Sequence, residues 1–268
     1  MLFNLKSEIN ININIILNIF ILMKSLITLI VGLFIARNNA FLNPVVKTAS
    51  GKKLNIIGQG PPTLFSTGLF GTMPRFLYNN YIDVLKKNLT IVTLDGINPV
   101  NENTIDEVCD ALNVDKINYL SHSSFLPEVL NNKRIQSAVL LDPINLPWIS
   151  FNGLTNSIIN LKYPTLIIKA GKLYEGSKIL PEWQKPEFKG EYNEEIYNNV
   201  GHPDILDNAW ANIAKQIGIW EMTEGPKMSI NEWKFNSNNN FIVKMRKEYR
   251  KYVAGRTLCF IHKNLNID

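Results

Sequence analysis

Ser123 is the residue best placed to act as a nucleophile. It stands in Ser121-His122-Ser123-Ser124-Phe125, directly after an apolar run at 117–120 that predicts a strand. A serine at a sharp turn between a strand and a helix exposes its hydroxyl for attack, and such a turn needs small residues two positions to either side. Ser121 meets this requirement, whereas Phe125 does not. The alternative is a serine that only caps a helix.

A nucleophilic serine needs a base that accepts its proton, and His202 is the candidate among three histidines. It lies in a loop after the run at 164–169, which is the last clear strand of the sequence. The alternative is a loop histidine with ordinary hydrogen bonds. We expect His122 to point elsewhere, because neighbouring side chains diverge at such a turn. His262, in an apolar helix-like run, is expected to be structural.

The acid that would orient the histidine has three candidates. Asp142 follows the strand predicted at 136–141, where Pro143 restricts the turn and the carboxylate would lie at the carboxyl edge of the sheet. Glu175, after the strand at 164–169, is the alternative, and Asp95, at the end of the strand before the nucleophile, is the third. We favour Asp142, and the order serine, acid, histidine is that of an α/β-type serine hydrolase.

An ester hydrolase also needs two backbone N–H groups that face the developing oxyanion. One would be Ser124, and the other Leu69 in the turn after the strand at 62–66, where Gly68 and Gly71 would supply bends with positive φ. The sequence has no glycine-rich phosphate loop, no zinc-binding histidine motif and no Cys-x-x-Cys. We therefore expect neither cofactor nor metal.

Short apolar runs alternate with helix-like stretches from residue 44 onward, which predicts an α/β fold with a mostly parallel sheet covered by helices. The predicted strands are 54–57, 62–66, 89–94, 117–120, 136–141 and 164–169. Helices are expected at 75–87 and at 103–112, the second capped by Thr104 or Asn103, and a short helix is expected after Ser123, ending near Asn131.

Composition narrows the class of protein. The 268 residues are 46% hydrophobic and 19% charged, which is ordinary for a globular chain. The net charge of the chain is +5. Residues 227–268 carry +6 and the rest of the chain carries −1, so the rest offers no basic surface for nucleic acid. Cys109 and Cys259 make neither a disulfide framework nor a metal cluster.

Residues 1–40 are expected to be a hydrophobic leader, with the catalytic domain at 41–268. A basic Met23-Lys24-Ser25 precedes the apolar stretch 26–36 and a polar end at 37–40, the pattern of a cleaved signal peptide; a retained membrane anchor is the alternative. Ala40-Phe41-Leu42-Asn43-Pro44 resembles the Ala-Phe-x-Pro motif of plastid-targeting leaders, with one extra residue. Localisation in the plastid is the expectation, with a membrane-anchored or secretory protein as alternative.

Several segments together resemble the chlorophyllases of the α/β-hydrolase superfamily. His122-Ser123-Ser124 matches the centre of the family's Gly-His-Ser-x-Gly-Gly, and Leu141-Asp142-Pro143 matches its Asp-Pro. Residues 201–207 are similar to its Gly-His-Met-Asp-Met-Leu-Asp, and 249–255 to its closing Arg-Arg-Phe-Val-Gly-Gly. The strand at 62–66 leads to Thr67-Gly68 in place of the family's His-Gly.

This resemblance implies an α/β-hydrolase fold with helices on both faces of the sheet and a minimal or absent cap domain. It also implies a Ser123–His202–Asp142 triad that releases phytol from chlorophyll, so the partner would be a small pigment or lipid ester, with association at a membrane surface. Phe125 and the 19 residues from Ser123 to Asp142 depart from the family. The alternatives are an esterase or lipase acting on another plastid lipid, and a non-catalytic pigment- or lipid-binding protein.

Overall fold

The computed structural model describes residues 46–96, 99–144, 158–171, 186–197, 200–211 and 240–265. The chain divides into two units, Met1–Pro44 and Val45–Asp268, and the described residues all belong to the second. The leader expected at 1–40 and the alternative acid Glu175 both lie outside the described residues. No helix in the described part of the chain combines the length and the apolar character that a membrane crossing requires.

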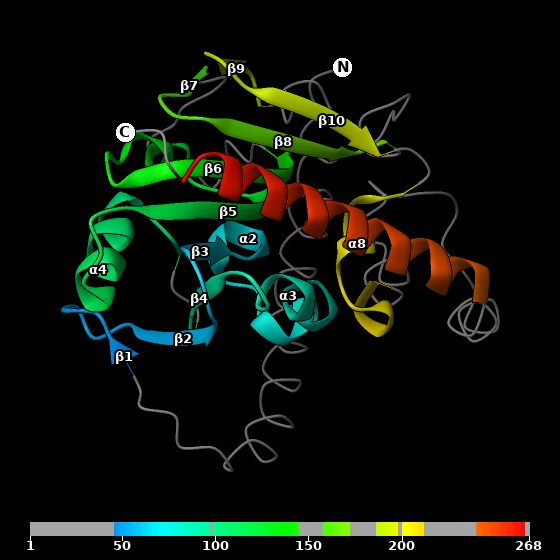
Figure 1. Ribbon diagram of the computed structural model, residues 1–268, viewed down its shortest axis with the longest axis horizontal. Helices are drawn as coiled ribbons and strands as arrows, with labels where there is room; N and C mark the ends of the chain where they lie inside the picture. The colour runs from blue at the N-terminus through cyan, green and yellow to red at the C-terminus, as the bar shows by residue number, and fades with distance from the viewer. Residues whose placement is uncertain are drawn as a thin grey trace, which may run out of the picture. The chain divides into compact units, whose positions relative to one another are not determined.

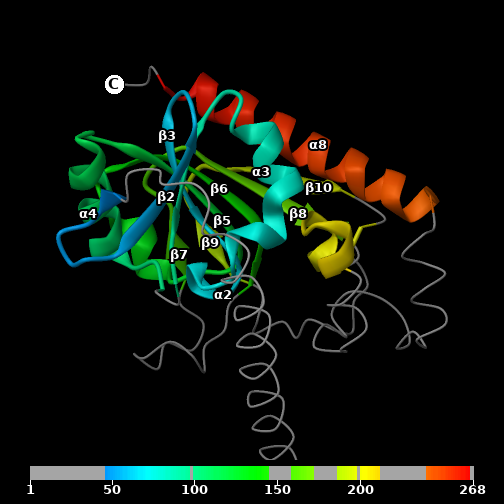
Figure 2. The same ribbon diagram turned by 90° about the horizontal axis from the view of Figure 1, so that it is seen from below.

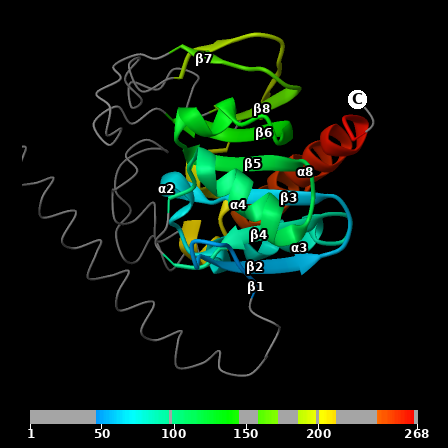
Figure 3. The same ribbon diagram turned by 90° about the vertical axis from the view of Figure 1, so that its left-hand side faces the viewer.

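The centre of the fold is an eight-stranded sheet of order β1-β2-β4-β3-β5-β6-β8-β10 (Figures 1 and 3). All neighbouring strands are parallel except β1–β2 and β2–β4, which are antiparallel. The strands are β1 (Val46–Lys47), β2 (Lys53–Gly58), β3 (Pro62–Ser66), β4 (Thr90–Leu94), β5 (Ile117–Ser124), β6 (Ile135–Ile144), β8 (Thr165–Ala170) and β10 (Asn193–Tyr197). β7 (Ile159–Asn160) and β9 (Phe188–Lys189) form a separate parallel pair.

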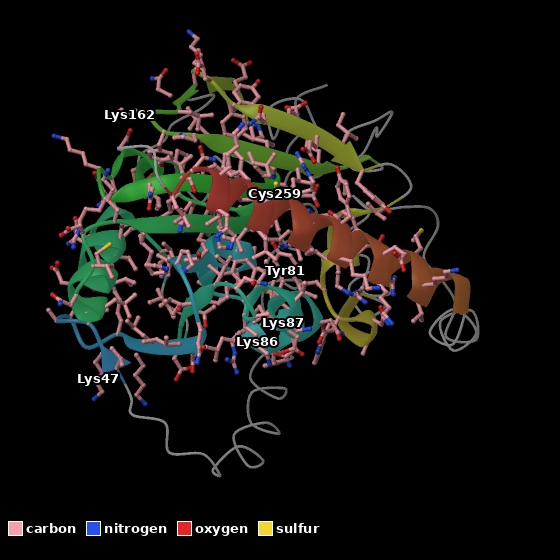
Figure 4. The ribbon with its side chains drawn as sticks, in the orientation of Figure 1. Lys47, Tyr81, Lys86, Lys87, Lys162 and Cys259 are labelled. Atoms are coloured by element: carbon pink, nitrogen blue, oxygen red, sulfur yellow. The ribbon has the colours of Figure 1, made fainter. Side chains whose placement is uncertain are left out.

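Helices cover both faces of this sheet (Figure 2). Helices α3 (Asn79–Leu85) and α8 (Asn240–Lys263) lie on one face, and α4 (Glu102–Leu112) and the 3₁₀ helix η2 (Pro127–Asn131) lie on the other. Successive side chains of a strand point to opposite faces, so Phe65 packs in the cluster of α3 and α8 and its neighbour Leu64 in the cluster of α4. Tyr81 of α3 lies beside α8 (Figure 4), where its hydroxyl is 3.1 Å from Thr257 Oγ1.

The strand order and the helices on both faces are those of the α/β-hydrolase fold, which confirms the predicted fold class. Residues 145–157, which follow β6, and 172–185, which follow β8, lie outside the described residues. The expectation of a minimal cap therefore stays a prediction.

Two predicted elements differ from those observed. The helix expected at 75–87 divides into the 3₁₀ helix η1 (Arg75–Tyr78) and α3. Helix α4 begins at Glu102 and is capped by Asn101, not by Asn103 or Thr104. The Asn101 side chain accepts a bond from Thr104 N–H, and the Thr104 hydroxyl accepts one from Asn101 N–H, so Thr104 is the reciprocal partner of the cap.

The strand predicted as the last, β8, is followed in the sheet by β10. The sequence of β10, Asn-Glu-Glu-Ile-Tyr, has no apolar alternation, because β10 is an edge strand whose residues are mostly exposed. Glu195 of β10 pairs with Arg256 of α8 and also accepts a bond of 2.7 Å from the Tyr252 hydroxyl. Polar contacts with α8 thus hold a strand that hydrophobic patterning does not reveal.

Candidate active site

Ser123 occupies a sharp backbone bend at the carboxyl end of β5. Its φ is +69°, a conformation that is uncommon for a residue other than glycine. The pairing of β5 with β6 shifts register between His122 and Ser124, so the regular ladder is interrupted at this residue. The bend directs the Ser123 hydroxyl to His202, and Oγ lies 2.9 Å from Nε2.

Phe125 does not turn Ser123 into the sheet. Its side chain is 4% exposed and packs in the apolar cluster on the α4 face, together with Val129 and Leu130 of η2. The backbone after Ser123 therefore moves away to bury Phe125, while the serine hydroxyl stays on the side of His202. The short helix expected after Ser123 is the 3₁₀ helix η2, which begins only at Pro127.

His202 begins the 3₁₀ helix η4 (His202–Ile205), and its ring is buried between Ser123 and Asp142. The separation of His202 Nδ1 and Asp142 Oδ2 is 3.8 Å, longer than a hydrogen bond. Asp142 is fully buried with φ of +45°, and its Oδ1 accepts a bond from Ala170 N–H at the end of β8. Asp95, the third candidate acid, is exposed after β4.

Burial determines the charge state of these groups. It lowers the pKa of His202 well below the ordinary value, and the adjacent His122 lowers it further. Burial raises the pKa of Asp142 to about 8, an effect that the Ala170 N–H opposes and the Asp204 carboxylate reinforces. At neutral pH the imidazole is therefore uncharged, which is the form that can accept a proton from a serine.

His122 does not point away from the site, and the expectation that it would is wrong. Its ring stacks on that of His202 with centroids 4.6 Å apart and planes 22° apart. His122 Nε2 lies 3.2 Å from the main-chain oxygen of His202, and Nδ1 lies 2.8 Å from the Tyr78 hydroxyl. The positive φ at Ser123 breaks the strand's alternation, so two consecutive side chains approach the same imidazole.

The turn after β3 packs against β5 and contains the predicted oxyanion donor Leu69. Leu69 and Phe70 have φ of +54° and +63°, so these two residues carry the left-handed backbone together with Gly71. Gly68 has an ordinary φ and is needed instead for space, because a Cβ there would lie 3.0 Å from the Tyr78 hydroxyl.

Backbone hydrogen bonds within this turn leave the predicted donor out. They run from Gly71 N–H to Thr67 O, from Thr72 N–H to Leu69 O and from Met73 N–H to Gly68 O, and none of the three uses Leu69 N–H. The structure places Leu69 in the turn and Ser124 at the end of β5, so the two predicted oxyanion donors lie on segments that pack together.

Helix α8 holds the segment that carries His202. The buried guanidinium of Arg246 pairs with the buried carboxylate of Asp204, with Nε and Oδ1 2.7 Å apart, and Asp204 Oδ2 accepts a bond of 2.8 Å from Gly201 N–H. Arg250 donates to Leu206 O at 2.8 Å and to Asn208 Oδ1 at 3.1 Å. Sequence reasoning did not assign roles to these residues, although Asp204 and Arg250 fall within the segments 201–207 and 249–255 that carry the resemblance.

Three buried groups, His122, Asp142 and His202, offer metal-ligand atoms within 4.8 Å of one another. Both ring nitrogens of His122, however, already face oxygen partners at 2.8 and 3.2 Å. The His122 imidazole is thus engaged by protein groups.

No protein-family model matches the sequence, and no curated protein is similar to it in sequence. Among solved structures, the chain is similar to a hydrolase from Pseudomonas aeruginosa PA01, with a TM-score of 0.40 and 14% identity over 60% of this chain and 91% of that one. A meta-cleavage product hydrolase from Pseudomonas fluorescens IP01 has a TM-score of 0.44 and 12% identity over the same shares.

A membrane phospholipase A has a TM-score of 0.39 and 12% identity, over 60% of this chain and 79% of that one. These similarities are distant, so the strand order carries the structural assignment. The antiparallel β2 and the parallel strands around β5, whose next-to-last residue Ser123 has a positive φ, give this chain the α/β-hydrolase fold.

Proposed function

We propose that this protein is a serine hydrolase of carboxylic esters, with Ser123 as nucleophile, His202 as general base and Asp142 as the acid that orients and stabilises the histidine. The observation that carries the proposal is the 2.9 Å contact between Ser123 Oγ and His202 Nε2 at a backbone bend of positive φ. A nucleophile and a neutral base within hydrogen-bond reach, with a carboxyl group behind the base, are the parts that acyl transfer requires.

The reaction would proceed through an acyl-enzyme. Ser123 Oγ attacks the ester carbonyl carbon as its proton passes to His202 Nε2, and the N–H groups of Leu69 and Ser124 stabilise the resulting oxyanion. The C–O bond to the alcohol then breaks, and His202 returns the proton to the leaving oxygen. Water, deprotonated by His202, attacks the acyl carbon, and the acid product leaves with Ser123 regenerated.

The substrate we propose is a hydrophobic ester, and chlorophyll, cleaved to chlorophyllide and phytol, is the favoured one. This choice is supported by the chlorophyllase-like segments around Ser123, Asp142 and 201–207. A plastid location reached through residues 1–40, and action at a membrane surface, belong to the same proposal. An esterase acting on another plastid lipid and a pigment-binding protein without turnover are the alternative outcomes of its test.

The test is turnover of chlorophyll by the full-length chain in mild detergent, with chlorophyllide and phytol followed by chromatography. Ser123→Ala should lower the rate by about a thousandfold or more, since it removes the nucleophile. Ser121→Ala, which removes another buried serine hydroxyl of β5, is the matched control and should retain activity. A fluorophosphonate probe should label the wild type and not Ser123→Ala.

Each other outcome points to a defined alternative. Probe labelling without phytol release would keep the hydrolase and discard chlorophyll as substrate. Pigment retention with neither labelling nor turnover would replace catalysis by binding.

A further inference from the structure

A line of hydrogen bonds runs from the turn after β3 to the backbone of His202. Gly68 N–H donates to the Tyr78 hydroxyl over 2.9 Å, the hydroxyl lies 2.8 Å from His122 Nδ1, and His122 Nε2 lies 3.2 Å from His202 O. These contacts link residues far apart in the sequence, and the first belongs to the turn that contains Leu69. The line therefore joins the two segments that would contact the reacting ester.

The direction of each hydrogen bond follows from the groups at its ends. A main-chain oxygen can only accept, so His122 Nε2 must carry a hydrogen that it donates to His202 O. A neutral imidazole then has no hydrogen on Nδ1, and this nitrogen accepts from the Tyr78 hydroxyl. The hydroxyl is itself an acceptor for Gly68 N–H, so every group along the line has the partner that its chemistry requires.

The charge of His122 matters because its ring stacks on the ring that would become an imidazolium. A positive charge 4.6 Å from the His202 centroid would oppose protonation of His202 during the reaction. Burial lowers the pKa of His122 to about 4, so its ring remains neutral over the range in which an esterase would work. His122 lowers the pKa of His202 only when His122 is itself protonated, so the neutral ring adds no charge that repels the proton.

We propose that Tyr78 and His122 are positioning residues, which hold the Leu69 turn and the His202 imidazole in one fixed arrangement around Ser123. The inference rests on the proposed function for its effect on catalysis, while the hydrogen-bond line itself concerns the folded protein alone. Neither residue would touch the reacting atoms. Both act by restricting where the turn and the imidazole can lie.

The variant Tyr78→Phe tests the proposal, with Tyr81→Phe as its matched control. Both tyrosines are buried and pack edge-on against Phe65. Tyr78→Phe would lose the hydrogen bonds to Gly68 and His122, whereas Tyr81→Phe would lose only the one to Thr257 of α8. We expect Tyr78→Phe to lower kcat about tenfold or more with little change in KM, and Tyr81→Phe to keep kcat within about twofold of the wild type. Equal kcat values in the two variants would overturn the proposal.

Nitrogen NMR of histidine-labelled protein supplies a readout that needs no turnover, and the sequence holds only three histidines to assign. His122 should show hydrogen on Nε2 and none on Nδ1, and the Nδ1 resonance should shift in Tyr78→Phe but not in Tyr81→Phe. A hydrogen on Nδ1 in the wild type, or an unchanged resonance in Tyr78→Phe, would overturn the inference. Absence of wild-type turnover and probe labelling would instead contradict the proposed function.

Discussion

The two halves of the site differ in how closely their groups approach one another. In the half built on β5 and η1, Ser123 Oγ lies 2.9 Å from His202 Nε2, and the Tyr78 hydroxyl lies 2.8 Å from His122 Nδ1. In the half built on β6 and η4, His202 Nδ1 and Asp142 Oδ2 are 3.8 Å apart. All of these groups are buried, so exposure to solvent does not explain the contrast.

Charge provides the physical explanation. The first half works with neutral groups, whose hydrogen bonds are complete before any substrate arrives. The second half depends on a carboxyl group that burial tends to keep protonated, and a strong contact with His202 requires the carboxylate. Catalytic hydrogen bonds are often long in a protein without ligand and shorten during the reaction. We therefore expect the Asp142–His202 contact to tighten when His202 takes the serine proton.

The largest effect on turnover should come from removing the carboxylate of Asp142. Asp142→Asn leaves an amide of nearly the same shape, but it cannot stabilise an imidazolium, so ester turnover should fall by about 10²- to 10⁴-fold. The exposed Asp95→Asn is the matched control and should leave turnover unchanged. Full activity in Asp142→Asn would show that Asp142 is not the acid, and Glu175 would then be the next residue to replace.

Replacing the buried Arg246 of α8 should lower the free energy of unfolding far more than replacing the exposed Arg256 of the same helix. Arg246→Met removes the guanidinium that pairs with buried Asp204, and the free energy of unfolding should fall by about 3–5 kcal/mol. Arg256→Met removes an exposed partner of Glu195 and should cost less than about 1 kcal/mol. Urea unfolding of both variants measures the difference, and similar losses would mean that the buried pair contributes no more than a surface one.

A smaller change in kcat/KM is expected when the pH is raised. Because the pKa of Asp142 is raised to about 8, its carboxylate forms as the pH rises through that value, whereas His202 is already neutral at lower pH. The value of kcat/KM should therefore increase about tenfold between pH 7 and pH 9. Asp142→Asn has no carboxyl group to titrate, so its profile should be flat over this interval. A wild-type rate independent of pH in this range would show that Asp142 is ionised throughout.

Local patterns predicted most of the sheet. The runs at 62–66 and 89–94 became β3 and β4 because apolar alternation between turn residues is a property of neighbouring residues. β10 was missed, since its charged Glu195 is satisfied by Arg256 and Tyr252 of a helix that lies about sixty positions later in the chain. The predicted cap of α4 differs from the observed one because both Asn101 and Thr104 are good capping residues. Their reciprocal contacts make Asn101 the cap and Thr104 its partner.

The sequence by its local patterns located six strands along the chain, a serine and an acid near strand ends, a histidine in a later loop, and small residues that allow sharp turns. These features depend on periodicity and on the backbone preferences of single residues, which act over a few positions. Only the tertiary structure decided that His122 stacks on His202, that Phe125 is buried on the opposite side from that pair, and that Arg246 pairs with Asp204. Such contacts join residues tens of positions apart in the chain. The charge state of these residues depends on their burial and not on their distance in the sequence.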